Sequence, residues 1–260
     1  HGHPGPVIGV ALDGTGYGPD GAIWGGEVLV AGVEGYERAA HLEYLPLPGG
    51  EAAIRRPYRI AWGYLLATQG EIPELPTLAA FPGQERAIVR QQVERGVNSP
   101  LTSSCGRLFD AVSAMTGVCP VTTFEAQAAI ALELAAREVD PASVEPYPFT
   151  VDEGGVIRVG ALLGAIAADV QAGRPVPQIA AGFHVSGAQM VARAAEQVRE
   201  RTGLSTAALS GGVFQNRLML RLAREHLRAA GFEVLSHRQV PANDGGLSLG
   251  QAVIALHSLL

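Results

Sequence analysis

The chain has 260 residues, of which 47% are apolar, and its formal net charge at pH 7 is −6. This composition is sufficient for a buried core, and an acidic balance without a long basic stripe argues against a general nucleic-acid binder. All nineteen basic residues are arginine, which excludes a P-loop lysine, a Schiff-base lysine and lysine-dependent kinase chemistry.

The first predicted element is a glycine-rich β-hairpin. A β-branched apolar run over residues 7–12 ends at Asp13-Gly14, further glycines follow up to position 21, and a second apolar run covers 22–30. Glycine permits positive φ and lets backbone N–H groups approach an anion, while Asp13 offers a carboxylate to a metal or a hydroxyl group. The alternative is an ordinary hairpin, and this stretch alone leaves both open.

The rest of the chain alternates between helical and strand patterns, which predicts an α/β fold with a mixed sheet. Residues 71–83 carry three prolines and are expected to form a surface loop. Helices are predicted at 51–69 (with a start or kink at Pro57), 84–95, 101–115, 124–139, a long region broken at 173–175, 215–230 and 247–259. Strands are predicted at 38–46, 148–150, 156–159, 207–209 and 232–235.

The segment ALSGGVFQN at 208–216 is the second candidate for chemistry. A buried strand ends at Ser210 and leads into a helix, so free N–H groups and the positive end of the helix dipole face one point. This pattern predicts a phosphate or adenosine site. A tight strand-to-helix turn without a ligand is the alternative.

Three acidic residues in later motifs have both a structural and a functional interpretation. Asp244, in PANDGG, either caps the terminal helix or binds a cation beside the strand ends. Asp110 lies three residues after Arg107 on one helix face, as a surface ion pair or as an acceptor for ribose hydroxyls. Glu125 occupies the expected first turn of a helix, where negative charge is stabilised.

Cysteine and histidine provide little evidence of a site. Cys105 and Cys119 are too few for a disulfide framework, have no metal-binding spacing and are typical of a reducing cytoplasm. A nucleophilic Cys105 is disfavoured because no histidine lies near it in sequence. No HxxxH or HExxH spacing is present. The apolar runs are far shorter than the ~20 residues of a membrane span, and no signal peptide is evident.

Four segments together resemble the HypF family of carbamoyltransferases, which act in [NiFe]-hydrogenase maturation. They are VIGVALDGTGYGPDGAIWGGE, SSCGRLFDAVSA, ALSGGVFQNRLML and VPANDGGLSLGQAVIA. The similarity runs from Pro6 to Leu256, and the order of the motifs makes it specific.

The resemblance implies an actin/sugar-kinase/Hsp70 (ribonuclease H-like) fold, with this chain as mainly the second lobe of a threonylcarbamoyl-transferase-like domain. The expected parts are strands at 6–46, a helical insertion at about 84–139 and a nucleotide-binding α/β part at about 156–260. The first lobe, with an HxxxH metal motif, and the other domains are expected upstream of His1.

The resemblance also implies a reaction. In the family, carbamoyl phosphate and ATP give carbamoyl adenylate, and the carbamoyl group passes to the C-terminal cysteine of HypE for cyanide ligand synthesis in the cytoplasm. The chain by itself is expected to be inactive. The alternatives are an O-carbamoyltransferase or a tRNA threonylcarbamoyl-transferase-like enzyme, and a non-catalytic module that binds nucleotide or HypE.

Site residues follow by matching motif positions. Asp13 and Asp244 match two carboxylates of a divalent-metal site (iron, zinc or magnesium) that upstream histidines would complete. No side chain is an evident general base. The nucleotide residues implied are Gly14, Thr15, Gly16 and Tyr17 along the phosphate, Ser210, Gly211, Gly212 and Val213 beside the adenosine, Asn216 at the adjoining helix start, and Asp110 and Glu125 on the ribose.

Overall fold

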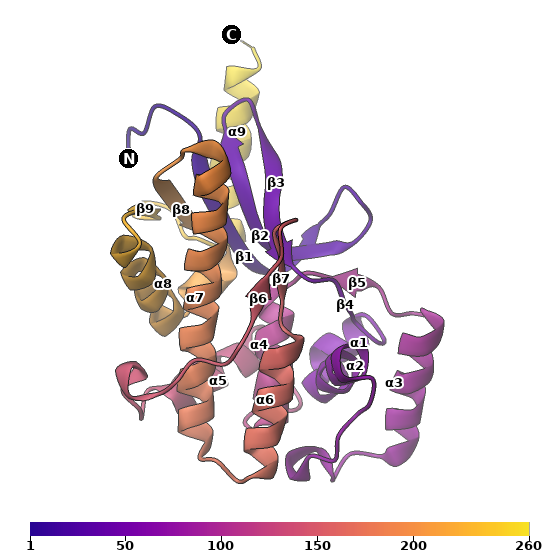
Figure 1. Cartoon of the computed structure of the whole chain (residues 1–260). Helices are drawn as coiled ribbons and strands as arrows, with labels where there is room; N and C mark the ends of the chain where they lie inside the picture. Colours follow the sequence, from indigo (N-terminus) through magenta and orange to yellow (C-terminus); the bar gives the residue numbers. More distant parts are fainter. Residues whose placement is uncertain (260) are drawn as a thin grey trace.

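A mixed β-sheet with helices packed against it forms the computed structural model, which describes residues 1–259 (Figure 1). Strands β1 (Val7–Tyr17), β2 (Ile23–Gly32) and β3 (Gly35–Leu42) form an antiparallel meander. Strand β8 (Thr206–Ser210) is parallel to β1, and β9 (Glu233–Ser236) is parallel to β8. The order β3-β2-β1-β8-β9 across the sheet is that of a ribonuclease H-like lobe, which confirms the predicted fold class.

Four short strands extend this sheet. Strand β7 (Val156–Arg158) runs parallel to β3 and pairs with β6 (Thr150–Val151). Strands β4 (Leu45–Pro46) and β5 (Leu101–Thr102) pair with each other. The prediction of a single strand at 38–46 is therefore wrong. Only its first part belongs to β3 and pairs with β2, whereas residues 45–46 form β4 and pair with β5.

The helices begin where local chemistry allows. Pro57 has no N–H to donate, so the stretch predicted as one helix divides into two (α1 and α2) with Pro57 at the first position of the second. Ser104 caps α4, so residues 101–104 precede that helix. The first six helices are α1 (Glu51–Arg55), α2 (Pro57–Gln69), α3 (Gly83–Arg95), α4 (Cys105–Met115), α5 (Gln127–Ala136) and α6 (Gly160–Gln171).

Three further helices follow: α7 (Val176–Thr202), α8 (Arg217–Ala229) and α9 (Leu247–His257). Short 3₁₀ turns, η1 (Pro76–Leu78), η2 (Pro141–Ser143), η3 (Gly212–Gln215) and η4 (Asp244–Gly246), complete the structure. The loop predicted at the surface over 71–83 instead buries Ile72, Leu75 and Leu78, because their apolar side chains pack on the core.

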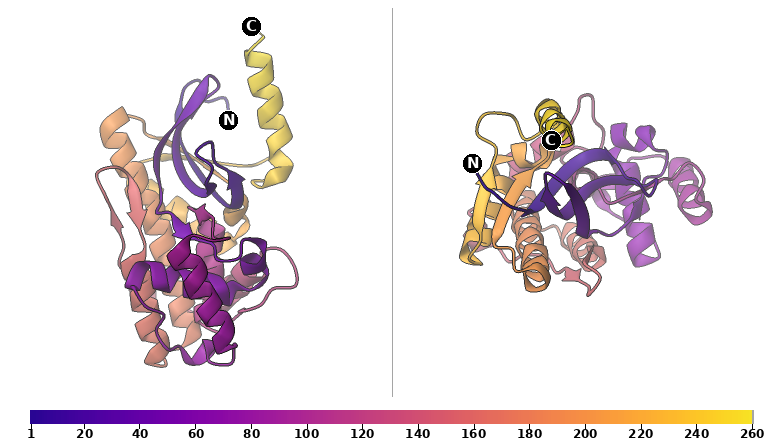
Figure 2. Two further views of the ribbon diagram at one scale, coloured as in Figure 1. Left: turned by 90° about the vertical axis from the view of Figure 1, so that its right-hand side faces the viewer. Right: turned by 90° about the horizontal axis from the view of Figure 1, so that it is seen from above.

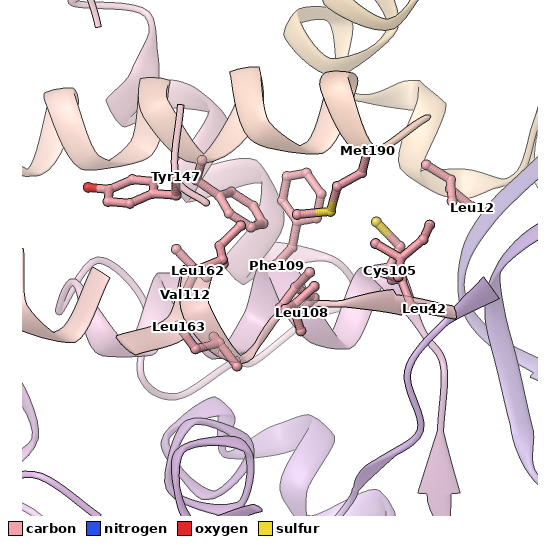
Figure 3. Packing of buried hydrophobic residues seen from close by; sticks show 14 of the residues in the cluster. Leu12, Leu42, Cys105, Leu108, Phe109, Val112, Tyr147, Leu162, Leu163 and Met190 are labelled. Atoms are coloured by element: carbon pink, nitrogen blue, oxygen red, sulfur yellow. The ribbon is translucent and has the colours of Figure 1, made fainter. Parts of the chain in front are cut away.

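The core lies between one face of the sheet and helices α4 and α7. Alternate residues of β1, namely Ile8, Val10 and Leu12, point to this face and are buried. Phe109 from α4 meets Phe183 from α7 edge to face, with ring centroids 4.8 Å apart. Figure 3 shows Leu12, Phe109 and Met190 close to Cys105 in this layer. Each such side chain contributes about 1.5–3 kcal/mol of burial free energy.

Helix α9 extends away from the rest of the structure (Figure 2). Its apolar side chains are exposed, with Leu247 at 60% and Leu256 at 62% of their full accessibility. Within residues 1–259, no helix combines the length and hydropathy that crossing a membrane requires.

A buried polar cluster joins β2, β3 and the start of α4. One carboxylate oxygen of Glu27 accepts hydrogen bonds from the N–H groups of Gly25 (2.6 Å) and Gly26 (2.7 Å). The other accepts from the Arg38 guanidinium (2.9 Å) and the Ser103 hydroxyl (2.5 Å). Two backbone N–H groups, one guanidinium and one hydroxyl therefore satisfy both oxygens of this buried carboxylate.

We expect Glu27→Ala to lower the free energy of unfolding by about 3–5 kcal/mol, because the N–H groups of Gly25 and Gly26 lose their acceptor and Arg38 keeps only Asp20, at 3.6 Å, as an ion-pair partner. Urea denaturation measures the change. The matched control is Glu51→Ala, which removes an ion pair with Arg55 in which the two side chains are 76% and 73% exposed. That control should change stability by less than about 1 kcal/mol, and an equal loss in both variants would contradict the prediction.

Candidate functional site

Asp13 lies in a bulge within β1. Pairing with β2 is regular up to Leu12 opposite Gly26 and resumes at Gly16 opposite Trp24, so residues 13–15 form a β-bulge. The predicted strand end at Asp13-Gly14 is wrong, because β1 continues to Tyr17. The chain reverses instead at 18–22, where Asp20 accepts a hydrogen bond from the N–H of Ala22 at 3.1 Å. We call residues 13–15 the Asp13–Thr15 bulge.

The start of α4 holds this bulge in place. The Ser104 hydroxyl donates to the carbonyl oxygen of Asp13 at 2.9 Å and to that of Gly14. The Asp13 carboxylate accepts a hydrogen bond from the Gly14 N–H at 2.8 Å. Gly106 has no side chain to separate the two elements, since a Cβ there would lie 2.8 Å from the Cα of Gly14. The SSCGR motif is thus in direct contact with the bulge.

The SGG motif approaches the bulge from β8. Gly211 has φ of +102°, and a Cβ there would lie 2.1 Å from the carbonyl oxygen of Leu12, so the position requires glycine. A Cβ on Gly212 would lie 3.0 Å from Oδ1 of Asp13 and 4.0 Å from Cβ of Asn243. The N–H of Gly211 donates to the carbonyl of Ala242 at 2.8 Å. The SSCGR and SGG motifs therefore both meet the chain at and next to Asp13, and the PANDGG motif lies against SGG.

Asp244 directly follows Asn243, whose Cβ lies 4.0 Å from a Cβ built on Gly212. The side chain that caps η4 belongs to Asn243, which accepts a hydrogen bond from the N–H of Gly245 at 3.2 Å. Asp244 lies in the first turn and is exposed. The capping alternative for Asp244 is therefore wrong, and its role as a metal ligand stays a prediction.

Ser210 borders an open cavity of about 440 Å³ at the carboxyl ends of β8 and β9. His237 also lines it, and its Nε2 lies 3.0 Å from the Ser210 hydroxyl. The carboxyl ends of parallel strands are the usual ligand position in α/β sheets. The sequence identified Ser210 but gave no signal for His237, because that contact joins two strands.

Two of the predicted nucleotide residues lie apart from this meeting point. Tyr17 is 91% exposed at the end of β1. Glu125 is exposed in the loop before α5, and the expectation that it belongs to a first helical turn is wrong, since α5 begins at Gln127 after a left-handed Ala126. The roles predicted for Tyr17 and Glu125 stay predictions, as do those of Thr15, Gly16 and Val213.

Arg107 and Asp110 form a buried ion pair. The guanidinium Nη2 lies 3.1 Å from a carboxylate oxygen of Asp110, and the two side chains are 9% and 4% exposed. The surface-pair alternative is therefore wrong. Burial raises the pKa of Asp110 to about 6, and Arg107 partly opposes this rise. The predicted contact between Asp110 and a ribose stays a prediction, and it concerns a side chain that is only 4% exposed.

Cys105 is a core residue. It is 6% exposed, and burial raises the pKa of its thiol to about 12. Nucleophilic cysteines need an accessible thiolate. This agrees with the sequence-based view that Cys105 is not a nucleophile.

Asn216 is oriented by a buried histidine that the sequence indicated only as partly buried. His184 is fully buried, and its Nδ1 bonds the carbonyl of Ala180 at 2.7 Å. Its Nε2 accepts from the Asn216 amide at 2.9 Å, while Oδ1 of Asn216 caps α8 by accepting from the N–H of Met219 at 2.8 Å. Burial lowers the pKa of His184 to about 4, which keeps the ring neutral and able to accept.

Asp13 and Asp244 fit part of a divalent-metal site. Both supply carboxylate oxygens, which suit magnesium and also bind zinc or iron. No group of three or more His, Cys, Asp or Glu side chains suited to a metal is found within residues 1–259. Two carboxylates are fewer than the three protein ligands of a typical catalytic site, so other groups would have to complete the coordination.

Comparison with known proteins identifies the family. The profile of the carbamoyltransferase Kae1-like domain, second subdomain, matches residues 9–251. The chain belongs to the HypF carbamoyltransferase family. Carbamoyltransferase HypF from Rhodobacter capsulatus is 40% identical over 258 residues, and a HypF homolog from Cupriavidus necator is 40% identical over 259 residues. The alignments cover 98% and 96% of this chain but 33% and 65% of those proteins.

Solved HypF structures have the same fold. Full-length HypF in a phosphate- and nucleotide-bound form is 41% identical, with a TM-score of 0.89 over 98% of this chain and 40% of that one. HypF from T. kodakarensis is 33% identical, with a TM-score of 0.86 over 98% of this chain and 34% of that one. The chain thus spans about a third to two thirds of the length of its HypF relatives.

The buried ring of His184 makes stability depend on pH. The unfolded ring titrates near 6.5 and the folded ring at about 4, so the unfolded state gains a proton first as pH falls, and this group's stabilisation is lost between those values. Its contribution is roughly 3 kcal/mol. We expect the free energy of unfolding, measured by urea denaturation from pH 7 to 4, to fall less steeply with decreasing pH in His184→Gln than in the wild type.

Asp110 provides a control of opposite sign. Its folded pKa is about 6 against 3.8 when unfolded, so its contribution becomes more favourable as pH falls through 6. In Asp110→Asn the free energy of unfolding should therefore fall more steeply than in the wild type as pH decreases below 6. Parallel pH profiles for the wild type and His184→Gln would contradict the prediction.

Proposed function

We propose that this chain supplies one half of the adenylate and metal site of a HypF-type carbamoyltransferase. The observation that supports the proposal best is the meeting of the bulge, the start of α4 and the SGG loop at Asp13, with Asn243 beside them. Glycine at three of these contacts lets the chain segments pack closely, which brings the Gly14 N–H group and the Asp13 carboxylate to the place where the proposal puts the phosphate and the metal. The phosphate- and nucleotide-bound relative is consistent with this use.

In this proposal the nucleotide lies across the carboxyl ends of β1 and β8. The phosphate faces Gly14 in the bulge, and the adenosine faces the cavity beside Ser210 and Gly211. His184 positions Asn216 at the start of α8, where the helix dipole is positive. Asp110 and Glu125 are the remaining ribose candidates.

Asp13 and Asp244 would hold the divalent cation together with ligands from outside residues 1–259. When bound, the cation would place positive charge near the phosphate, in a chain that has no lysine. The other residues of this chain place the Asp13 carboxylate. Ser104 fixes the bulge through a hydrogen bond, and Gly212 leaves space for the carboxylate because it has no side chain.

The proposed reaction is acyl transfer from carbamoyl adenylate to the C-terminal cysteine of HypE. The thiolate sulfur attacks the carbamoyl carbon, the bond from that carbon to the phosphate oxygen breaks, and AMP leaves with the electron pair. AMP is a good leaving group, so the main requirements are alignment and exclusion of water. The attacking thiolate of HypE needs no general base. Cys105 of this chain has no part in the step, because it is buried and its thiol pKa is raised.

The family match favours HypE as acceptor over the alternatives. An O-carbamoyltransferase or a tRNA-modifying relative keeps the SGG and aspartate features but is not expected to carry SSCGRLFDA. That stretch is present here at 103–111, and its Ser104 holds the bulge. A non-catalytic role in binding nucleotide or HypE would apply if the full-length protein binds nucleotide but does not transfer the carbamoyl group.

We expect Asp244→Ala in the full-length protein to abolish carbamoyl transfer to HypE, with a change in unfolding free energy below about 1 kcal/mol, since Asn243 provides the cap. Transfer is followed by mass spectrometry of HypE, and stability by thermal unfolding. Glu225→Ala on α8, an exposed residue paired with Arg221, is the control and should retain full activity. Full activity of Asp244→Ala would remove Asp244 from the site.

We also expect residues 1–260 on their own to bind AMP weakly and to transfer no carbamoyl group, because two carboxylates make an incomplete metal site. Calorimetry with AMP and Mg²⁺ measures binding, and incubation with carbamoyl phosphate, ATP and HypE tests transfer. Carbamoylation of HypE by these residues alone would overturn the half-site proposal.

A further inference from the structure

Arg107 places a buried positive charge directly against the Asp13–Thr15 bulge. Its backbone N–H donates to the Ser104 hydroxyl at 3.1 Å, in the first turn of α4. A Cβ built on Gly14 would lie 3.5 Å from Nη2 of Arg107. The guanidinium therefore lies beside the bulge, at a distance where even a side chain at position 14 would make ordinary van der Waals contact with it.

The guanidinium has unused donors. Its Nε is buried and has no hydrogen-bond partner within residues 1–259. Its Nη2 lies 3.1 Å from Oδ2 of Asp110, while a guanidinium carries five N–H donors in a planar fork. Because buried polar groups are normally paired, an arginine that is 91% buried and incompletely paired beside a glycine bulge indicates an acceptor supplied by a ligand.

The surroundings favour an anion as that ligand. Arginine binds phosphate through two parallel hydrogen bonds, and its weak hydration suits a buried site. Arg38, another arginine beside the SSCGR motif, is already bound to Glu27 at 2.9 Å and to the Tyr44 hydroxyl at 2.6 Å. The Nε of Arg38 also lacks a partner in the described part of the chain, but Arg107 is the arginine whose guanidinium lies beside Gly14, in a chain without lysine.

We propose that Arg107 is an anion-binding residue of the site and donates to a phosphate oxygen of the nucleotide at the bulge. The inference rests on the proposed function, since it requires a nucleotide beside Gly14. Asp110 is then a positioning residue, whose carboxylate at 3.1 Å holds the guanidinium under the bulge. In this proposal, a phosphate oxygen accepts hydrogen bonds from the guanidinium N–H groups that do not contact Asp110.

The test compares AMP with adenosine, which differ only by the phosphate. Calorimetry on the full-length protein, in buffer with a chelator so that no metal holds the phosphate, measures both dissociation constants. The wild type should bind AMP at least ~10-fold more tightly than adenosine. Arg107→Gln should lose most of this preference, with adenosine binding unchanged. The control is Arg137→Gln, which changes a 56% exposed arginine that follows α5 and pairs with Glu133, and it should keep the preference.

A second variant guards against misfolding. Arg107→Gln leaves Asp110 buried without its partner, so Arg107→Gln/Asp110→Asn restores a neutral pair and should show the same lost preference. Asp110→Asn alone should lose less of the preference than the Arg107 variants do, because Arg107 is still present but is held less firmly. Loss of a ribose contact would weaken adenosine and AMP equally.

The outcomes separate the two proposals. An AMP preference that survives in both Arg107 variants overturns the inference and leaves the nucleotide site intact. A wild-type protein that binds neither AMP nor adenosine overturns the proposed function, and the inference with it. Loss of most of the preference in the Arg107 variants, with a smaller loss in Asp110→Asn and adenosine still bound, supports both.

Discussion

The Ser103-Ser104 pair connects the sheet, the helical layer and the candidate site. The hydroxyl of Ser103 bonds Glu27, which in turn holds the N–H groups of Gly25 and Gly26 in β2. The hydroxyl of Ser104 bonds the bulge carbonyls of β1 and accepts the N–H of Arg107 in α4. Two adjacent serines thus fix both strands of the hairpin relative to one helix end, and the position of Asp13 depends on them.

Close backbone approach makes this geometry possible. Gly26 would place a Cβ 2.2 Å from the carbonyl oxygen of Ser103, and Gly25 one 2.6 Å from that of Asp13. Gly106 and Gly211 are equally restricted on the other sides of the bulge. Glycines at these four contacts let the main chains of β1, β2, β8 and the start of α4 pack directly against one another around the bulge.

The proposed site combines three carboxylates with one buried guanidinium. Asp13 and Asp244 add negative charge where a cation would be bound, whereas Arg107 adds positive charge on the α4 side. Asp110 holds Arg107 in position through Nη2 and leaves the Nε–H group of Arg107 without an acceptor within residues 1–259. A nucleotide phosphate could therefore be held by a metal on one side and by arginine on the other, in a chain whose basic residues are all arginine.

The sequence by itself determined the order of the elements, the mixed sheet and the family. Apolar periodicity, proline and glycine act over a few residues, so they are visible locally. It also identified Asp13, Ser210 and Gly212 as members of motifs. The ends of elements were less certain where proline or a serine cap decided them, as at Pro57 and Ser104.

Only the tertiary structure decided which groups are buried and which meet. Ser104 and Asp13 are 91 residues apart along the chain, and His184 and Asn216 are 32 apart, so no local pattern reveals either contact. The burial of Arg107 and Asp110 follows from packing α4 against β1, which converted a plausible surface pair into charged groups beneath the bulge. Local chemistry therefore set the motifs, and long-range packing set their relative positions and their electrostatic environment.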